Sequence, residues 1–382
     1  MTTKSDQNRR WPIVHYPAEV ESKAFQGKLY GYFHQEANEY NVLAFGENNG
    51  VAGELIGFIT DNKESRDEGK LVGIWEKNQL TFWQGDRACK KAAYDLLLDI
   101  FSRNTGILET DMMLEASAVI SGVGSVGSLV ALELARSGVG HFLLVDHETF
   151  SYHNICRHQL GMNDVGKFKV HALKERILQI NPHAKVITET NILERLSKGV
   201  FDRFITPNTI VVGCADNREG DLYGNHIAAL YDIPFVSIGF WERACAGEVF
   251  YTHPGKMPCY RCVFGENSAV QSLQQSANRR HYTTEEDLSK VRFEPGISTD
   301  INFITTIGIK LILDLLNRHN KQFIPRLLGN LAQFTLICNT DDPQVGGEKV
   351  EIFSYPLQVT KSIHIDYAEG CTDCSIARIR EM

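Results

Sequence analysis

The chain of 382 residues has no apolar run long enough to cross a membrane and no apolar stretch behind its charged opening, MTTKSDQNRRWPIVHYP. The longest apolar segment, residues 301–316, is interrupted by Lys310 and Asp314, which favours a buried helix over a membrane span. Because no secretory signal is indicated, we expect a cytoplasmic protein that needs no membrane. Positive charge is not in excess either, since 39 Lys and Arg stand against 47 Asp and Glu. The net charge of −8 excludes a global cationic surface for nucleic acid.

Internal repeats, low-complexity tracts and an even set of cysteines are also missing. Nine cysteines in a chain without an export signal argue against a disulfide framework. Hydrophobic residues at 43% and charged residues at 23% are typical of a soluble globular protein. A length of 382 residues predicts two or three domains, with enough chain to bury a core.

Residues 1–100 predict a small α+β domain made of an antiparallel sheet plus one helix. Short runs rich in aromatic and β-branched residues, separated by polar or glycine-bearing breaks, are typical of antiparallel strands: KLYGYF, YNVLAFG, ELIGFIT, KLVGIWE and QLTFWQG. A stripe of Ala92, Leu96, Leu97 and Ile100 then predicts a helix over residues 88–103. No residues with obvious chemistry gather in this region, so its role stays open.

Residues 101–382 follow a different pattern, because apolar strands alternate with helices from Ala118 onward. The runs AVIS, FLLVD and TIVVGCAD are predicted strands, and residues 125–137 and 169–180 are predicted helices between them. Such alternation predicts parallel βαβ units and hence a Rossmann-like, doubly wound α/β domain. The polar stretch 263–298 is expected to be a mobile loop, followed by a strong helix over residues 301–317.

A glycine-rich motif follows the first strand of this domain. Gly122, Gly124 and Gly127 are spaced G-x-G-x-x-G at the start of a predicted helix, and Asp146 ends the next strand. Glycines in this context let a phosphate approach backbone N–H groups at a helix N-terminus, while the carboxylate can bind ribose hydroxyls. The motif therefore predicts nucleotide binding over a mere packing role, and it leaves the kind of nucleotide open.

Two C-x-x-C pairs stand near the end of the chain, Cys259 with Cys262 and Cys371 with Cys374. Two-residue spacing lets a pair of thiolates share one tetrahedral metal ion. Because 108 residues separate the pairs, spacing alone does not distinguish a shared metal site from two unrelated turns with free thiols.

Further motifs follow in a fixed order: Asn154-Ile-Cys-Arg157, Gly166-Lys-Phe-Lys169, Asn181-Pro182, Asp216-Asn217 and the later Cys259-Tyr-Arg-Cys262. Together with the glycine motif and Asp146, this ordered set resembles the superfamily of ThiF, MoeB and the ubiquitin-activating enzymes. The resemblance covers about Arg103 to Cys374. It implies ATP-dependent adenylation of the C-terminal carboxylate of a small ubiquitin-like or sulfur-carrier protein, or of a peptide, with release of pyrophosphate.

The resemblance also implies roles for individual residues. Arg157 and Lys169 would neutralise the ATP phosphates, and Asp216 would hold Mg²⁺ on the loop after a parallel strand, where ligands bind in doubly wound sheets. Arg103, in the segment Phe-Ser-Arg-Asn, resembles an arginine that reaches the phosphates from a partner subunit, which implies a homodimer. The nucleotide-binding set would be Gly122, Gly124, Gly127, Asp146, Asn154 and Asn217.

In the same family the cysteine pairs converge on one zinc ion. A closed set of four thiolates, Cys259, Cys262, Cys371 and Cys374, implies a structural rather than a catalytic zinc. Two segments, SRNTGIL and NICRH, resemble those of bacterial members that are encoded beside ubiquitin-like proteins in conjugation systems linked to phage defence. In such systems a conjugating enzyme would be a further partner.

The sequence departs from the family pattern in two places. No cysteine lies between Cys262 and Cys338, which excludes a thioester in the usual loop and leaves Cys245 and Cys156 as weak alternatives. Where the family commonly places an arginine after the D-N pair, this chain has Asp221, with Arg218 nearby. Either Arg218 substitutes for that arginine or the ATP contact is absent.

Two other classes of function fit part of the sequence. A dehydrogenase that transfers hydride with NAD would use the glycine motif and Asp146, but it has no part for Arg157, Lys169 or the cysteine pairs. A catalytically silent nucleotide-binding scaffold would keep the fold while residues 1–100 recruit a partner protein. Pyrophosphate exchange that depends on a carboxylate partner distinguishes adenylation from both.

Overall fold

The computed structural model describes residues 11–46, 53–62, 64, 70–215, 217–241, 244–265, 296–339 and 360–381. It divides into two compact units, Met1–Thr105 and Gly106–Met382. Among the described residues, no helix is long and apolar enough to span a membrane.

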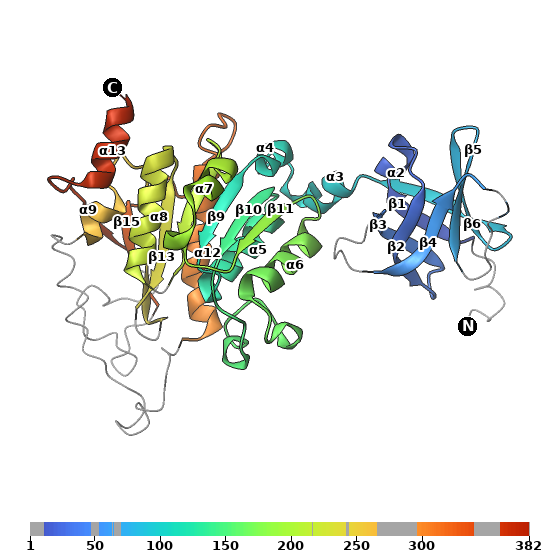
Figure 1. The fold of residues 1–382 in the computed structure, drawn as a ribbon, viewed down its shortest axis with the longest axis horizontal. Coiled ribbons are helices and arrows are strands. Elements are labelled where there is room, and N and C mark those ends of the chain that lie inside the picture. The colour runs from blue at the N-terminus through green and yellow to red at the C-terminus, as the bar shows by residue number, and fades with distance from the viewer. Residues whose placement is uncertain are drawn as a thin grey trace, which may run out of the picture. The chain divides into compact units, whose positions relative to one another are not determined.

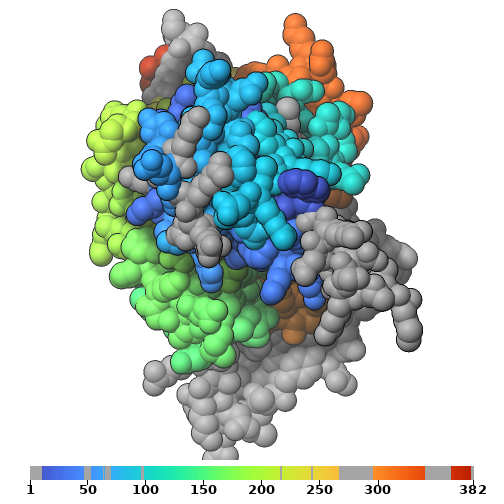
Figure 2. All heavy atoms as spheres, turned by 90° about the vertical axis from the view of Figure 1, so that its right-hand side faces the viewer, coloured from blue at the N-terminus to red at the C-terminus, as the bar shows by residue number. Residues whose placement is uncertain are grey.

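The first unit contains one mixed sheet in the strand order β7-β6-β5-β4-β2-β3-β1-β8 (Figure 1). Its strands are β1 Ile13–Pro17, β2 Gly27–His34, β3 Glu39–Phe45, β4 Glu54–Thr60, β5 Leu71–Glu76, β6 Gln79–Gln84, β7 Arg87–Ala88 and β8 Lys90–Tyr94. Its helices are α2 Glu19–Ser22, α3 Leu96–Phe101 and the 3₁₀ turn Ser102–Asn104. Alternate side chains, among them Val14, Leu29, Val42 and Phe82, form its core. In Figure 2 this unit is the dark-blue to light-blue region.

Two expectations about the first unit are wrong. Its sheet is not antiparallel throughout, because β1 runs parallel to both β3 and β8, and β4 runs parallel to β5. The helix expected over 88–103 is present only as α3, since residues 90–94 form strand β8 instead. Pairing with β1, from Ile13 opposite Lys90 to Pro17 opposite Tyr94, satisfies backbone groups that a helix would otherwise have paired locally.

The second unit is built on a sheet in the order β11-β10-β9-β12-β13-β14-β15-β16. The first five of these strands are parallel to their neighbours, and β14, β15 and β16 continue the sheet antiparallel. The strands are β9 Ser117–Ser121, β10 His141–Val145, β11 Lys185–Glu189, β12 Thr209–Gly213, β13 Phe235–Phe240, β14 Ala246–Thr252, β15 Phe334–Cys338 and β16 Thr360–Ile363. The predicted parallel βαβ units are therefore present.

Helices cover both faces of this sheet (Figure 1). The helices are α4 Thr110–Leu114, α5 Ser125–Arg136, α6 Lys169–Ile180, α7 Lys198–Phe204, α8 Arg218–Tyr231, α9 Tyr260–Phe264, α12 Ser298–Leu316 and α13 Thr372–Glu381. Along β9, Ala118 and Ile120 pack with α5, α6 and α12, whereas Val119 packs on the opposite face with α7 and α8. This alternation follows from the two-residue period of a strand that is buried on both sides. Most of the expected loop 263–298 lies outside the described residues.

Candidate functional site

A cavity of about 1490 Å³ lies at the carboxyl ends of β9, β10 and β12. Strands β10 and β12 flank β9, so the chain leaves β9 in one direction along the sheet and later returns on the other side. Ligands of doubly wound sheets bind at such a switch point. The predicted site residues that line the cavity are Gly122, Gly124, Asp146, Asn154, Arg157, Lys169 and Asn217.

The glycine motif forms a tight turn between β9 and α5. Gly122 has φ of +82°, a conformation that L side chains rarely adopt, and Gly124 is the N-cap residue of α5 beside open space. Gly127 lies behind the turn, where an added Cβ would stand 2.0 Å from the Gly122 carbonyl oxygen. The three glycines thus allow the turn, the open helix N-terminus and the close packing of helix against strand that phosphate binding needs.

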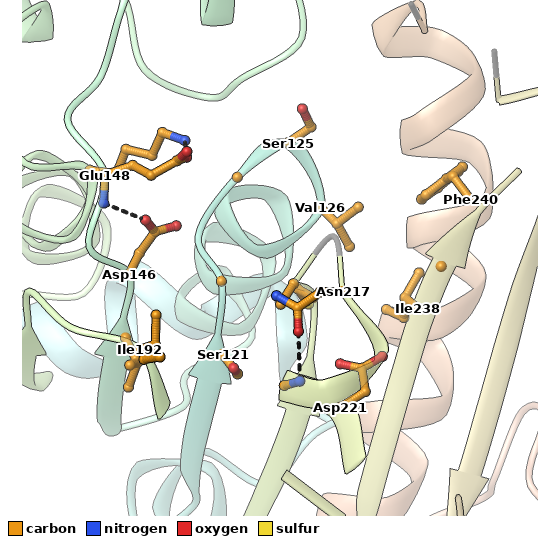
Figure 3. A pocket seen from close by; sticks show the side chains of 18 of the residues that line it. Ser121, Ser125, Val126, Asp146, Glu148, Ile192, Asn217, Asp221, Ile238 and Phe240 are labelled. Atoms are coloured by element: carbon orange, nitrogen blue, oxygen red, sulfur yellow. Dashed lines mark hydrogen bonds and ion pairs between the residues drawn. The ribbon is translucent and has the colours of Figure 1, made fainter. Parts of the chain in front are cut away.

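Asp146 holds this turn from the neighbouring strand. Its Oδ2 accepts a hydrogen bond of 2.9 Å from the Val123 backbone N–H. Its Oδ1 accepts one of 2.8 Å from the Glu148 N–H, which Figure 3 shows as a dashed line. Each carboxylate oxygen has more than one lone pair, so both can still accept from a ribose hydroxyl. The carboxylate lies at the cavity wall, in the place that the glycine motif predicts.

His158 also holds this turn, a role that the sequence motifs do not predict. Its Nε2–H donates to the Val123 carbonyl over 2.8 Å, while its Nδ1 accepts from the Leu160 N–H over 3.1 Å, which fixes the neutral tautomer. Burial lowers the pKa of His158 to about 4. Asp146 and His158 therefore bind the N–H and C=O of one residue, Val123. The only sequence signal is the place of His158 directly after Arg157.

Two basic side chains that the resemblance places near the phosphates, Lys169 and Arg157, line the cavity beside this turn. The Lys169 side chain is 6% exposed, and its ammonium forms an ion pair with the half-exposed Glu148 carboxylate. The hydrogen bond from Lys169 lowers the pKa of Glu148. Arg157 lines the same cavity, after a turn in which Asn154 Oδ1 accepts from the Ser151 N–H over 2.9 Å. Sequence reasoning had no signal for Glu148.

The loop after β12 forms the next part of the wall. Asn217 caps α8, because its Oδ1 accepts from the Gly220 N–H over 2.6 Å (Figure 3). Asp216, the predicted Mg²⁺ ligand, lies outside the described residues, whereas its neighbours Ala215 and Asn217 line the cavity. Its role therefore stays a prediction.

Arg218 and Asp221 follow Asn217, in the segment where the resemblance implies an arginine. Both line the cavity. Asp221 Oδ2 accepts hydrogen bonds from the Ser237 hydroxyl at 2.6 Å and the Tyr260 hydroxyl at 3.3 Å, and burial raises the pKa of Asp221 to about 7. Arg218 donates to Glu248 Oε1 over 3.0 Å. This part of the wall thus combines one guanidinium with two carboxyl groups.

Arg103 belongs to the first unit, where it is exposed on the 3₁₀ turn Ser102–Asn104. Of the two alternative thioester residues, Cys245 is buried and Cys156 is exposed, with its Sγ 3.5 Å from the His153 carbonyl. The predicted roles of all three residues stay untested by this geometry.

The four cysteines of the two pairs come together at one buried point. Their Sγ atoms all lie within 4.8 Å of one another, with Cys259 and Cys371 at 3.4 Å and Cys262 and Cys374 at 3.6 Å. Four converging thiolates are a ligand set for tetrahedral zinc, so the donor chemistry fits the implied metal. Asp373, between the last two cysteines, accepts hydrogen bonds from Asn225, His226 and Arg261. These contacts join the cluster to α8 and α9.

The strand order, the glycine turn and the cavity at the switch point place this unit in the class of Rossmann-like α/β domains that bind nucleotides. Over residues 98–342 the chain matches the ThiF family, well over half of its length. The chain therefore belongs to the ThiF family, which confirms the resemblance inferred from the ordered motifs.

Two curated relatives illustrate the similarity. Molybdopterin-synthase adenylyltransferase of Salmonella typhimurium is 31% identical over 158 residues, 40% of this chain and 62% of that protein. Ubiquitin-like modifier-activating enzyme 5 of Caenorhabditis elegans is 28% identical over 165 residues, 41% of this chain and 39% of that protein. These matches thus span less than two thirds of the relatives' own length. A crystal structure of E. coli MccB with MccA-N7isoASN gives a TM-score of 0.49 at 20% identity, covering 69% of each chain.

Proposed function

We propose that this protein is an adenylyltransferase that activates the C-terminal carboxylate of a small ubiquitin-like or sulfur-carrier protein, or of a peptide. The observation that carries the proposal is one cavity that joins the glycine turn and Asp146 to the cations Arg157 and Lys169. Membership in the ThiF family and similarity to a protein named molybdopterin-synthase adenylyltransferase support it.

In the proposed reaction a carboxylate oxygen attacks the α-phosphorus of ATP. A bond forms between that oxygen and phosphorus, the bond from phosphorus to the bridging oxygen breaks, and pyrophosphate leaves with the electron pair. No side chain needs to gain or lose a proton in this step, so positioning and charge neutralisation supply the catalysis. The N–H groups at the start of α5 would hold phosphate, Asp146 the ribose, and Lys169 and Arg157 the developing negative charge.

The resemblance to the family suggests roles for four further residues of the site. Asp216 would hold Mg²⁺ against the phosphates, and Asn154 and Asn217 would complete the nucleotide contacts. Arg103 would act across a homodimer. The cavity volume of about 1490 Å³ exceeds the 300–1,000 Å³ that is usual for one small ligand, which supports a site that holds ATP together with an extended carboxyl-terminal segment.

The cysteine cluster would hold a structural zinc ion. All four thiols are buried and face one another, so no position is open for a substrate. The metal would supply folding energy to α9 and α13 rather than chemistry.

The biological setting is proposed on resemblance alone: a cytoplasmic bacterial system that conjugates a ubiquitin-like protein, with a conjugating enzyme downstream, linked to phage defence. If a strain that lacks the gene resists phage as well as the parent strain does, this setting is contradicted. The proposed adenylation reaction would not be affected by that result.

The activity is tested by exchange of labelled pyrophosphate into ATP, with and without the small proteins and peptides encoded beside the gene. We expect exchange that requires one such partner. Lys169→Met should lower its rate about 100-fold, because the variant loses a charge that stabilises the transition state. Lys174→Met, on the same helix but outside the cavity wall, is the matched control. Equal rates for Lys169→Met and Lys174→Met would contradict the proposed role of Lys169.

A further inference from the structure

Tyr260 connects the cysteine cluster to the cavity. It lies between Cys259 and Cys262, at the start of α9, and its side chain is 1% exposed. The ring packs against other rings, with centroids 5.1 Å from Phe250 and 4.5 Å from Phe264. A buried ring that is held on several sides has little freedom to turn, so its hydroxyl occupies a defined position.

The backbone of Tyr260 is tied to the cluster as well. Its N–H donates to Asn225 Oδ1 over 3.0 Å, and Asn225 Nδ2 donates to Asp373 Oδ2 over 2.7 Å. Asp373 stands between Cys371 and Cys374 and is fully buried. Asn225 therefore links the backbone of Tyr260 to Asp373, which lies between the cysteines of the second pair.

The hydroxyl of Tyr260 reaches the cavity wall. Arg218 Nη1 donates to this hydroxyl over 2.9 Å, and the hydroxyl donates to Asp221 over 3.3 Å. The Arg218 guanidinium also lies 3.8 Å from the centre of the Phe264 ring and pairs with Glu248. Two of these three supports, Tyr260 and Phe264, come from the helix that begins directly after Cys259.

Arg218 stands close to where phosphates would bind. It is the first residue of α8, and the loop before it packs on the glycine turn, since a Cβ added to Gly122 would lie 2.9 Å from the Ala215 nitrogen. Arg218 and Gly122 line the same cavity at the switch point of the sheet. A guanidinium that is already held in one position there loses less side-chain entropy on contact with a bound phosphate than a freely moving one would.

We propose that Tyr260 is a positioning residue that fixes the Arg218 guanidinium toward the phosphates of the bound nucleotide. The inference rests on the proposed nucleotide site, and it adds a second role for α9: the helix that follows Cys259 and contains Cys262 also shapes the cavity wall.

The test is the dissociation constant of Mg·ATP, measured by titration calorimetry on the full chain. We expect Tyr260→Phe to raise it about tenfold, since each factor of ten corresponds to roughly 1.4 kcal/mol and one charged hydrogen bond is lost. Tyr251→Phe removes another buried hydroxyl, one that donates to the Leu331 carbonyl, and is the matched control. It should change the dissociation constant by less than about twofold.

A double-mutant cycle separates positioning from general loosening. In the Arg218→Met background, Tyr260→Phe should have no further effect, because the group it positions is gone. Zinc content, measured in parallel, should equal that of wild type. The inference is overturned if Tyr260→Phe binds ATP as tightly as Tyr251→Phe does, if its effect persists in Arg218→Met, or if it loses metal. Wild-type protein that does not bind ATP would instead overturn the proposed nucleotide site.

Discussion

Replacement of His158 by phenylalanine should destabilise the glycine turn between β9 and α5, because the ring nitrogens of His158 bind backbone groups there. His158 is 7% exposed and serves two buried backbone groups, the Val123 carbonyl and the Leu160 N–H. Each group left without a partner costs about 1–3 kcal/mol, so His158→Phe should lower the free energy of unfolding by about 2–6 kcal/mol. His158→Gln can present a donor and an acceptor in similar places and should lose less.

Urea-induced unfolding, followed by circular dichroism, measures this difference, and calorimetry with Mg·ATP measures its effect on the turn. We expect His158→Phe to lose both stability and ATP affinity, with His158→Gln between it and wild type. If His158→Phe equals wild type in both measurements, the turn does not depend on this side chain and the reasoning is refuted.

The pH dependence of the free energy of unfolding tests the role of His158 independently. In the folded protein the pKa of His158 falls from 6.5 to about 4, so between these values the unfolded chain binds the extra proton. Stability from the neutral ring is complete above pH 6.5 and is lost as pH falls toward 4, by roughly 3 kcal/mol in total. Both variants should therefore show a flatter stability profile across this window, and profiles parallel to that of wild type would contradict the assignment.

Two further variants test the glycine turn and the cysteine cluster. Gly127→Ala should lower the melting temperature by several degrees, since its Cβ would meet the Gly122 oxygen at 2.0 Å. Gly124→Ala meets nothing within 4 Å and changes only an N-cap residue, so it should lower the melting temperature less. Equal melting temperatures for the two would contradict the packing argument. Cys371→Ser should lose the zinc that we expect in wild type. Cys89→Ser, which replaces a buried cysteine of the first unit, should keep it. Elemental analysis measures the metal content of each. Metal-free wild type would contradict the zinc assignment.

Local pattern predicted much of the second unit. The alternation of apolar strands and helices gave the βαβ units, and the glycine motif with Asp146 located the turn that the structure shows between β9 and α5. These signals lie within short stretches of chain, where hydrophobic period and turn chemistry determine structure.

Features that depend on distant partners were not predictable in this way. Lys90–Tyr94 contains good helix formers, yet it pairs with β1 from more than 70 residues earlier. His158 contacts Val123, and Glu148 contacts Lys169. The spacing of residues along the chain predicts neither contact. The cysteine pairs had the right spacing individually, and only the folded chain brings Cys259 to Cys371, 112 residues away.

The central claim, attack of a carboxylate on the α-phosphorus of ATP, is tested most directly by following an oxygen atom. A partner peptide or protein that supports pyrophosphate exchange is labelled with ¹⁸O in its terminal carboxylate, and the adenylate is then cleaved with hydroxylamine. The account predicts AMP that carries one ¹⁸O atom and pyrophosphate that carries none. Label in inorganic phosphate, with ADP as the other product, would contradict it.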